Sequence, residues 1–145
     1  MKKRSVLITL LVLMMVSMLA VPMASAAYPS DYRINVHPYS CPNGINAESK
    51  GTMPVAIFGG YVGDEFLDVT TIDPASIQLD GVGLALKGNG KLFCNLGDID
   101  GDGYVDLLCK FSIPELNDAG AFEDTDFTLT CDQGTWEDNY NNWIH

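Results

Sequence analysis

Four carboxylates crowd into one short stretch of this chain, DIDGDGYVD. They are Asp98, Asp100, Asp102 and Asp106, which occupy positions 1, 3, 5 and 9 of a loop that turns at Gly103. Like charges this close repel each other unless a cation lies among them. Calcium takes about six to eight oxygen ligands in a flexible geometry, and a glycine permits the sharp turn that returns position 9 to the ion. The spacing therefore predicts a calcium site.

Position 7 of this loop is Tyr104, whose main-chain carbonyl is the expected backbone ligand. An EF-hand is the first alternative, but its position 12 needs a bidentate Glu, and here that position is Cys109. Magnesium is disfavoured because it demands a near-octahedral shell and keeps its waters. An acidic turn without an ion is the remaining alternative, and the ligand spacing together with the turn glycine favours calcium over it.

Apolar residues alternate on both sides of the acidic stretch, which indicates strands rather than helices. If Asp98 and Asp106 close the loop, the two strands form a hairpin with one predicted buried face. Its cross-strand pairs would be Leu96 with Leu107, Cys94 with Cys109, and Leu92 with Phe111.

Four cysteines, an even number, predict two disulfides in an exported chain. No CxxC spacing is present, so the sequence does not support a thiolate zinc site. Four cysteines allow three connectivities, and the hairpin register favours Cys94 with Cys109, which places Cys41 with Cys131 by elimination.

The first 26 residues have the pattern of a signal peptide. Lys2, Lys3 and Arg4 precede an apolar run, and Ala24-Ser25-Ala26 matches an A-x-A cleavage site. A retained N-terminal anchor is the alternative; the run is short for a membrane span. The sequence predicts a secreted or cell-surface protein whose residues 27–145 form a single domain, with no stable membrane insertion after cleavage.

The remaining chain has only five basic residues against 19 acidic ones, a formal charge of −14. Such a surface repels nucleic acid and anionic lipid and attracts cations. Nucleic acid is therefore excluded as an expected partner.

Short β-rich runs separated by Gly, Pro, Asp and Asn dominate residues 27–145 and predict an all-β fold, an antiparallel sandwich of immunoglobulin-like type. One helical turn is expected over 114–118, and residues 136–145 are expected to be an irregular strand or a docked tail. The expected strands are 32–36, 55–59, 76–79, 83–87, 91–96, 104–111 and 127–131.

Three blocks in order, INVHPYSCPNGINAESKGTMPVAIFG, DVTTIDPASIQLDGV and GDIDGDGYVDLLCKF, carry a resemblance to a family. They resemble an uncharacterised secreted accessory domain of bacteria and archaea, with the pattern I-D-I-K-P-G-S-x-P-N-x-I-N, then P-V-A-I-L, then F-D-x-T-T-[IV]-D-P, then D-x-D-G-D-G-x-x-D-L. Asn35 and His37 depart from it, as do Tyr39 and the inserted Leu67. The acidic loop itself is similar to those of integrin-type FG-GAP blades. The resemblance implies a calcium-binding β-sandwich accessory domain without catalysis.

The residues before the acidic loop that match the family pattern are Ile34, Pro38, Ser40, Pro42, Asn43, Ile45, Asn46, Ser49, Gly51, Pro54, Val55, Ala56, Ile57, Asp68, Thr70, Thr71, Asp73, Pro74 and Ser76.

Three aromatic residues near the end, Trp136, Tyr140 and Trp143, together with Tyr61, are candidates for a sugar-binding platform, although packing of the two Trp side chains onto the core is favoured.

Two further acidic segments are weighed in the same way. Asp73-Pro74 is expected to begin a turn. A solvated acidic surface is favoured over a second calcium site at Glu123, Asp124, Asp126 and Asp132.

No catalytic motif is present, and Glu115 with Asp118 is a weak pair for glycoside hydrolysis. The sequence therefore predicts a non-catalytic binding or adhesion module that recognises a glycan or a surface protein. A structural subunit with calcium-dependent self-association is the alternative, and a hydrolase is the least favoured reading.

Overall fold

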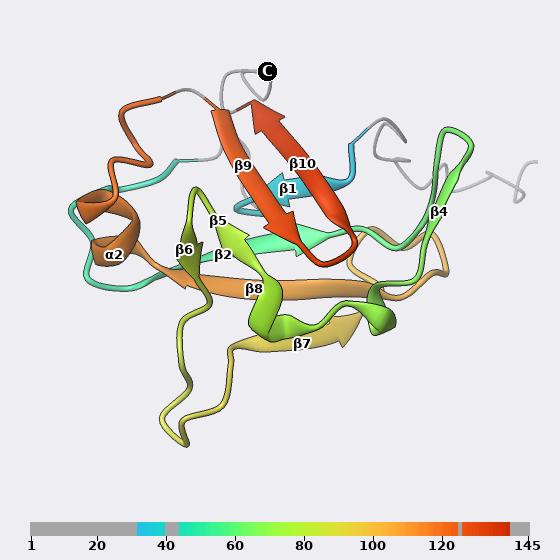
Figure 1. Ribbon diagram of the computed structural model, residues 1–145, viewed down its shortest axis with the longest axis horizontal. Helices are drawn as coiled ribbons and strands as arrows, with labels where there is room; N and C mark the ends of the chain where they lie inside the picture. Colours follow the sequence, from blue (N-terminus) through green and yellow to red (C-terminus); the bar gives the residue numbers. More distant parts are fainter. Residues whose placement is uncertain (1–31, 40–43, 125, 140–145) are drawn as a thin grey trace, which may run out of the picture.

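The computed structural model describes residues 32–39, 44–124 and 126–139, and their strands form two antiparallel four-stranded sheets (Figure 1). The first sheet has the order β1 (Ile34–Val36), β2 (Thr52–Ile57), β8 (Asp106–Ser112), β7 (Cys94–Gly97). The second has the order β10 (Gly134–Asn139), β9 (Asp126–Cys131), β5 (Gln78–Leu79), β6 (Val82–Gly83). A separate hairpin pairs β3 (Gly60–Val62) with β4 (Glu65–Leu67).

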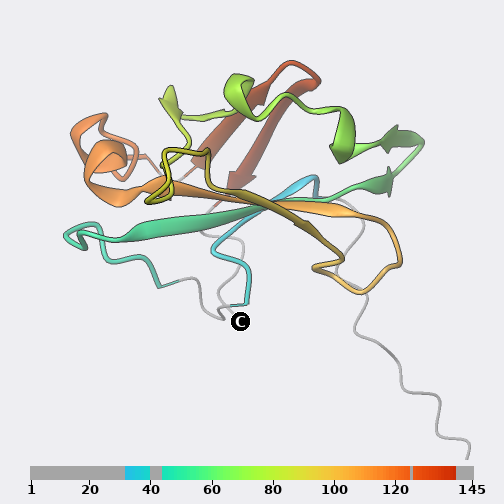
Figure 2. The same cartoon turned by 90° about the horizontal axis from the view of Figure 1, so that it is seen from below.

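The two sheets pack face to face, as the two layers of Figure 2 show. From Leu107 onward, β8 alternates buried and half-buried residues, as a strand with one core-facing side does. Its buried side chains Leu107, Cys109 and Phe111 meet Leu79, Leu129 and other residues of the second sheet in one hydrophobic core. The predicted all-β antiparallel sandwich is confirmed.

Buried polar side chains close one side of the sandwich. The Val36 N–H of β1 donates to Asp138 Oδ2 of β10 at 2.7 Å, which ties the edges of the two sheets together. Arg33, also buried, donates through Nη1 to the carbonyls of Phe58 and Gly60, each at 3.0 Å, and through Nη2 to the carbonyl of Glu65 at 2.9 Å. Arg33 thereby anchors the β3–β4 hairpin to β1.

In the described residues, the connections between strands contain three short helical segments. The 3-10 turns η1 (Val69–Thr71) and η2 (Pro74–Ser76) lead into β5. α2 (Ile113–Asp118) follows β8 directly, with Ser112 as its N-cap, and confirms the helical turn expected over 114–118.

Several expected strands differ from those observed. The β3–β4 hairpin was not expected, because its sequence contains the loop-forming Gly60 and Gly63. The strand expected over 83–87 is reduced to β6 and one isolated bridge between Leu86 and Leu92. Residues 136–139 belong to β10, and 140–145 lie outside the described residues.

No helix among the described residues has the length and apolar character needed to cross a bilayer. The predicted signal segment, residues 1–26, lies outside the described part of the chain.

The strands flanking the acidic loop pair in the predicted register. Leu96 lies opposite Leu107, and Cys94 lies opposite Cys109. The prediction that all six apolar residues share a buried face is wrong for Leu96, which is 58% exposed. β7 is the edge strand of its sheet and pairs only with β8. The second sheet therefore does not cover Leu96 near the end of β7. The expected third pair is also wrong, because Leu92 bridges Leu86 instead of Phe111.

Candidate metal site

The acidic loop joins the ends of β7 and β8, where Gly97 pairs with Asp106. This closure brings together carboxylate oxygens of Asp98, Asp100 and Asp106, one from each residue, all within 4.8 Å of one another. In the part of the chain that the structure describes, no other group of three His, Cys, Asp or Glu side chains meets this condition. The three aspartates form the candidate site, which we call the Asp triad.

Main-chain N–H groups of the loop hold its carboxylates in place. Asp98 accepts from Gly101 at 2.8 Å through Oδ1 and from Gly103 at 3.1 Å through Oδ2. Asp100 Oδ1 accepts from the N–H of Asp102 at 3.1 Å. The positive φ angles of Gly101 and Gly103, 79° and 91°, allow the chain to wrap around these side chains.

Asp106 is the fully buried member of the triad and has no exposed surface. Its Oδ1 accepts from the Gly59 N–H at 2.9 Å, and its Oδ2 accepts from the N–H groups of Ile99 at 2.6 Å and Asp100 at 3.4 Å. Burial raises the pKa of Asp106 above its ordinary value, and these hydrogen bonds oppose that rise. A cation beside Asp106 would offset the cost of burying its charge.

Asp100 is the triad carboxylate that is most easily protonated in the absence of an ion. Loss of hydration raises its pKa to about 6, the charges of Asp106 and Asp102 add to the rise, and the hydrogen bond from the Asp102 N–H opposes it. The arrangement therefore favours either a proton or a cation at Asp100.

Two predicted ligands lie beside the triad rather than in it. Asp102 is not among the three gathered carboxylates; its Oδ1 accepts from the Tyr104 N–H at 2.8 Å, and its side chain contacts Asp100. The role of the Tyr104 carbonyl as a ligand remains a prediction.

Two glycines after β2 let the loop pack against the body of the protein. A Cβ on Gly59 would lie 2.0 Å from the carbonyl oxygen of Val105, closer than any real contact. Gly60 has a φ of 77°, and a Cβ there would meet the ring of Tyr104 at 2.5 Å. The pair Gly59-Gly60 thus places β8, the loop and the β3–β4 hairpin side by side, which sequence analysis did not anticipate.

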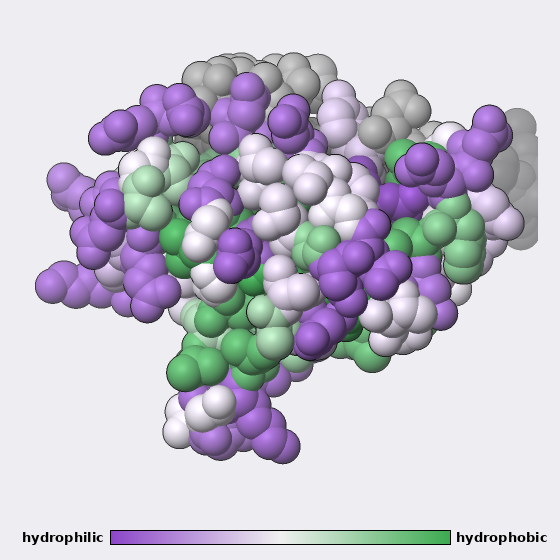
Figure 3. Space-filling model, viewed as in Figure 1, coloured by the Kyte–Doolittle hydropathy of each residue, from purple (hydrophilic) through white to green (hydrophobic). Residues whose placement is uncertain are grey.

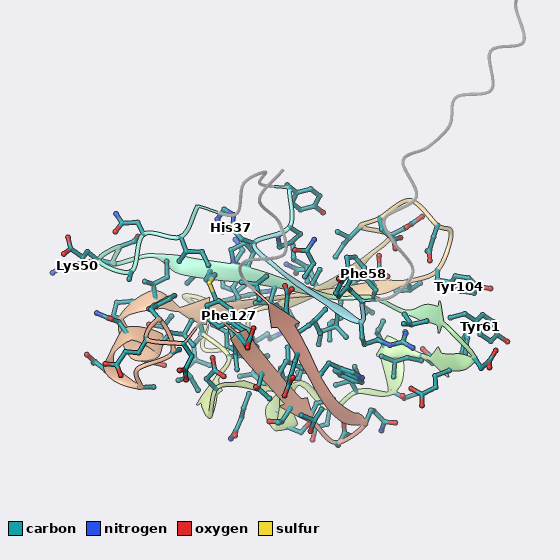
Figure 4. The ribbon with its side chains drawn as sticks, turned by 90° about the horizontal axis from the view of Figure 1, so that it is seen from above. His37, Lys50, Phe58, Tyr61, Tyr104 and Phe127 are labelled. Atoms are coloured by element: carbon teal, nitrogen blue, oxygen red, sulfur yellow. The ribbon has the colours of Figure 1, made fainter. Side chains whose placement is uncertain are left out.

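An exposed aromatic cluster lies next to the loop. Tyr61 and Phe66 are cross-strand neighbours in the β3–β4 hairpin, with ring centroids 5.0 Å apart. Tyr104 of the loop lies 6.3 Å from Tyr61 and 5.9 Å from Phe66 in edge-on contacts. Figure 4 shows Tyr61 and Tyr104 together at one end of the molecule.

The three rings of this aromatic cluster remain open to solvent, with exposed fractions of 59% for Tyr61, 55% for Phe66 and 41% for Tyr104. Figure 3 shows hydrophobic residues over the β3–β4 hairpin, set among hydrophilic ones.

Of the predicted sugar-binding residues near the C-terminus, the structure describes only Trp136. Trp136 is half-buried, packs against the core and covers Gly134, as the packing alternative expected. It also lines an open cavity of about 350 Å³ with Arg33 and Glu65, among others. Tyr140 and Trp143 lie outside the described residues.

The cysteines of the described chain are free thiols in this structure. Cys94 and Cys109 nevertheless lie opposite each other, as predicted, and share a side-chain hydrogen bond, although the predicted disulfide between them is not formed. Cys41, the predicted partner of Cys131, lies outside the described residues.

The other acidic segments have different roles. Asp68 and Asp73 cap the 3-10 turns η1 and η2 through hydrogen bonds to Thr70 and Ala75, each at 3.0 Å, which confirms the turn expected at Asp73-Pro74. Asp132 lies over the second of these turns and accepts from Ser76 Oγ at 3.3 Å. A second calcium site was weighed at Glu123, Asp124, Asp126 and Asp132. In the described residues, the carboxylates of this set do not form a cluster that could hold an ion.

Comparison with known proteins gives no match: no family model, no curated protein and no solved structure is similar to this chain. Arguments about function therefore start from the geometry of the Asp triad and its surroundings.

Proposed function

We propose that this protein is an exported, non-catalytic binding module whose acidic loop holds one calcium ion. The observation that carries the proposal is the Asp triad, whose three carboxylates converge within 4.8 Å at the end of a paired hairpin. Hydrogen bonds from main-chain N–H groups orient these carboxylates before any ion arrives. A preformed site of this kind loses little conformational freedom when it binds an ion.

The chemistry of the donor set favours calcium. All three triad ligands are carboxylate oxygens, the hard donors that calcium prefers. The Asp102 side chain and the Tyr104 carbonyl lie in the same loop and offer further oxygen ligands. Calcium takes about six to eight such ligands. The ion's charge would also offset the loss of hydration and the repulsion that together raise the pKa of Asp100.

The aromatic cluster supports a role in recognition. Exposed rings that already contact one another lose little side-chain entropy on binding, and they stack on sugar rings or on the apolar side chains of a protein. Tyr104 belongs to both the loop and the cluster, so an ion in the loop would position one of the three rings. We propose the cluster as the contact surface for a glycan or a surface protein.

The first experiment follows thermal unfolding of the purified protein in EDTA and then in excess Ca²⁺ or Mg²⁺. An ion that binds only the folded state at about a hundredfold excess over its Kd contributes about 2.7 kcal/mol. The midpoint should therefore rise by several degrees with Ca²⁺ and by less with Mg²⁺.

Two variants test whether the calcium-dependent rise in the unfolding midpoint comes from the acidic loop. Asp98→Asn should remove most of the calcium-dependent rise, whereas Asp118→Asn, which changes an exposed carboxylate at the end of α2, should retain it. Equal responses from the two variants would refute the loop as the calcium site.

A second experiment tests recognition. Wild-type protein and a Tyr61→Ala, Phe66→Ala double variant are compared on a glycan array and on cell-envelope fractions, with Ca²⁺ and with EDTA. We expect calcium-dependent binding that the double variant loses while its calcium-dependent stability persists.

Size-exclusion chromatography of the same samples tests the alternative, calcium-dependent self-association through these rings. A calcium-induced increase in molecular size that the double variant lacks would favour an assembly subunit over a module for a foreign partner.

A further inference from the structure

A buried asparagine lies beside the Asp triad with an unused hydrogen-bond acceptor. Asn35 is the central residue of β1, and its neighbours Ile34 and Val36 belong to the core. Because side chains alternate along a strand, Asn35 points to the outer face of the first sheet. It is nevertheless only 6% exposed, and its Oδ1 atom is buried without a hydrogen-bond partner.

Such an atom needs a physical explanation. A buried polar atom without a hydrogen-bond partner destabilises the fold, and native proteins contain few such atoms. An apolar residue of similar size would avoid this cost, because Leu or Val fits a strand position as well as Asn does.

The surroundings of Asn35 connect it to the acidic loop. A small, partly open cavity of about 10 Å³ lies on this face of the sheet. Its lining is formed by Asn35, Pro38, Tyr39, Phe58, Ile99 and Asp100. Asp100 belongs to the Asp triad, and the Ile99 N–H donates to Asp106, so two of the residues that line the cavity also take part in the metal site.

The cavity has about the volume that one water molecule requires. Asn35 Oδ1 and the Asp100 carboxylate are both hydrogen-bond acceptors, and a water between them can donate one hydrogen to each. The oxygen lone pairs of that water then need a positive partner. A cation held by the triad is such a partner, and calcium commonly retains water in its shell.

We propose that this cavity holds a water ligand of the cation and that Asn35 Oδ1 accepts a hydrogen bond from it. The inference rests on the calcium site proposed above and extends it to a residue of β1, more than sixty positions earlier in the sequence. Asn35 is in this view a positioning residue, which fixes the ion through the water instead of touching it.

Two substitutions separate this role from simple packing. Asn35→Leu replaces the acceptor with an apolar side chain of similar branching, and Asn35→Asp replaces the amide with an anionic acceptor of the same shape. Outer partners of metal ligands typically change metal affinity by about 10–100-fold. In calorimetric titrations with Ca²⁺ we expect Asn35→Leu to raise Kd by roughly tenfold and Asn35→Asp to lower it.

Thermal unfolding in EDTA supplies the second readout. Asn35→Leu should unfold at the wild-type temperature or above, since it removes a buried unpaired oxygen. Asn35→Asp should unfold below wild type in EDTA and recover with Ca²⁺, because it adds a carboxylate beside Asp100. Opposite effects of one variant on calcium affinity and on ion-free stability are not expected of a residue that only packs.

A matched control comes from the other sheet. Asp80 also has a buried oxygen without a partner, Oδ2, but it lies in the turn between β5 and β6 and bonds to Thr128. Asp80→Asn should leave the calcium Kd within twofold of wild type.

Calcium Kd values for Asn35→Leu and Asn35→Asp that both match wild type would overturn the inference. Absence of calcium binding by the wild-type protein would instead refute the proposed function.

Discussion

Two aspartate-rich segments of this protein use the same side chain in opposite ways. In the acidic loop, Asp98, Asp100 and Asp106 face one another. In the segment that leads to β5, Asp68 and Asp73 each face a main-chain N–H at the start of a 3-10 turn. The first arrangement concentrates negative charge at a point, and the second spreads it over separate hydrogen bonds.

One aspartate from each segment shows the same contrast in its pKa. Hydrogen bonds from the Thr70 hydroxyl and N–H lower the pKa of Asp68 from its ordinary value. Loss of hydration and the neighbouring charges raise the pKa of Asp100 to about 6. An aspartate-rich sequence is therefore a cation site only where the fold turns the carboxylates toward each other, which here requires the pairing of β7 with β8.

A disulfide across that pairing should give the largest effect. The Lys110 N–H donates to the Phe93 carbonyl at 2.9 Å, so Cys94 and Cys109 form the next, non-hydrogen-bonded pair, whose Cα atoms lie within disulfide reach. Oxidation should close a loop of about 15 residues and contribute about 3 kcal/mol to the free energy of unfolding.

Peptide mapping of the oxidised protein and urea unfolding with and without reductant measure this effect. A bond from Cys109 to Cys131 instead of Cys94 would contradict the prediction.

Gly59→Ala should separate the loop from the body of the protein. The added Cβ would collide with the Val105 carbonyl, and main-chain atoms cannot yield as a flexible side chain does. Overpacking of this kind costs about 1–3 kcal/mol. We expect a lower unfolding free energy in urea and weaker calcium binding, because the Gly59 N–H also holds Asp106.

Gly97→Ala, at a position with open space around its Cβ, is the control for this substitution. Similar losses in the two variants would show that the close approach of Gly59 to Val105 does not matter.

Asp73→Ala tests the capping segment. Loss of an N-cap typically costs about 1 kcal/mol, and calcium has no part in this cap. The midpoint of thermal unfolding should fall by the same few degrees in EDTA and in Ca²⁺. A loss that calcium reverses would mean that the capping segment also binds the ion, and the contrast between the two segments would fail.

The expected dependence of ion-free stability on pH is small, because Asp100 is only half-buried and water screens its charge. Because the pKa of Asp100 is raised to about 6 in the folded state, this state holds more protons than the unfolded state between about pH 4 and pH 6. In EDTA the contribution of Asp100 should therefore lower stability as pH rises through this window. Asp100→Asn should reduce this slope in thermal scans, leaving the contribution of Asp106, and an unchanged slope would contradict the assignment.

Calcium affinity should have the opposite pH dependence. At pH 5 only about a tenth of Asp100 would be ionised, so Kd measured by calorimetry should be roughly tenfold higher than at pH 7. A Kd that is the same at both pH values would exclude Asp100 as a ligand.

Much of the hairpin could be predicted from its residues. Alternation on both sides of DIDGDGYVD predicted two strands and the pairing of Cys94 with Cys109, because register in a hairpin follows from the turn that closes it. The same periodicity could not predict that Leu96 is exposed, since exposure depends on how far the opposite sheet extends.

The β3–β4 hairpin was missed for a related reason. Its strands are three residues long, and Arg33, from a distant part of the chain, anchors them through the carbonyls of Gly60 and Glu65. A signal of this kind is non-local, and no periodicity within residues 60–67 reports it.

The sequence by itself determined the all-β class, the acidic loop and the strands that close it, because alternation, glycine placement and ligand spacing are local properties of the chain. Only the tertiary structure decided which carboxylates converge, which rings join Tyr104, and that Asn35 lies beside Asp100. These are contacts between segments far apart in sequence, and they follow from how the two sheets and their connections pack.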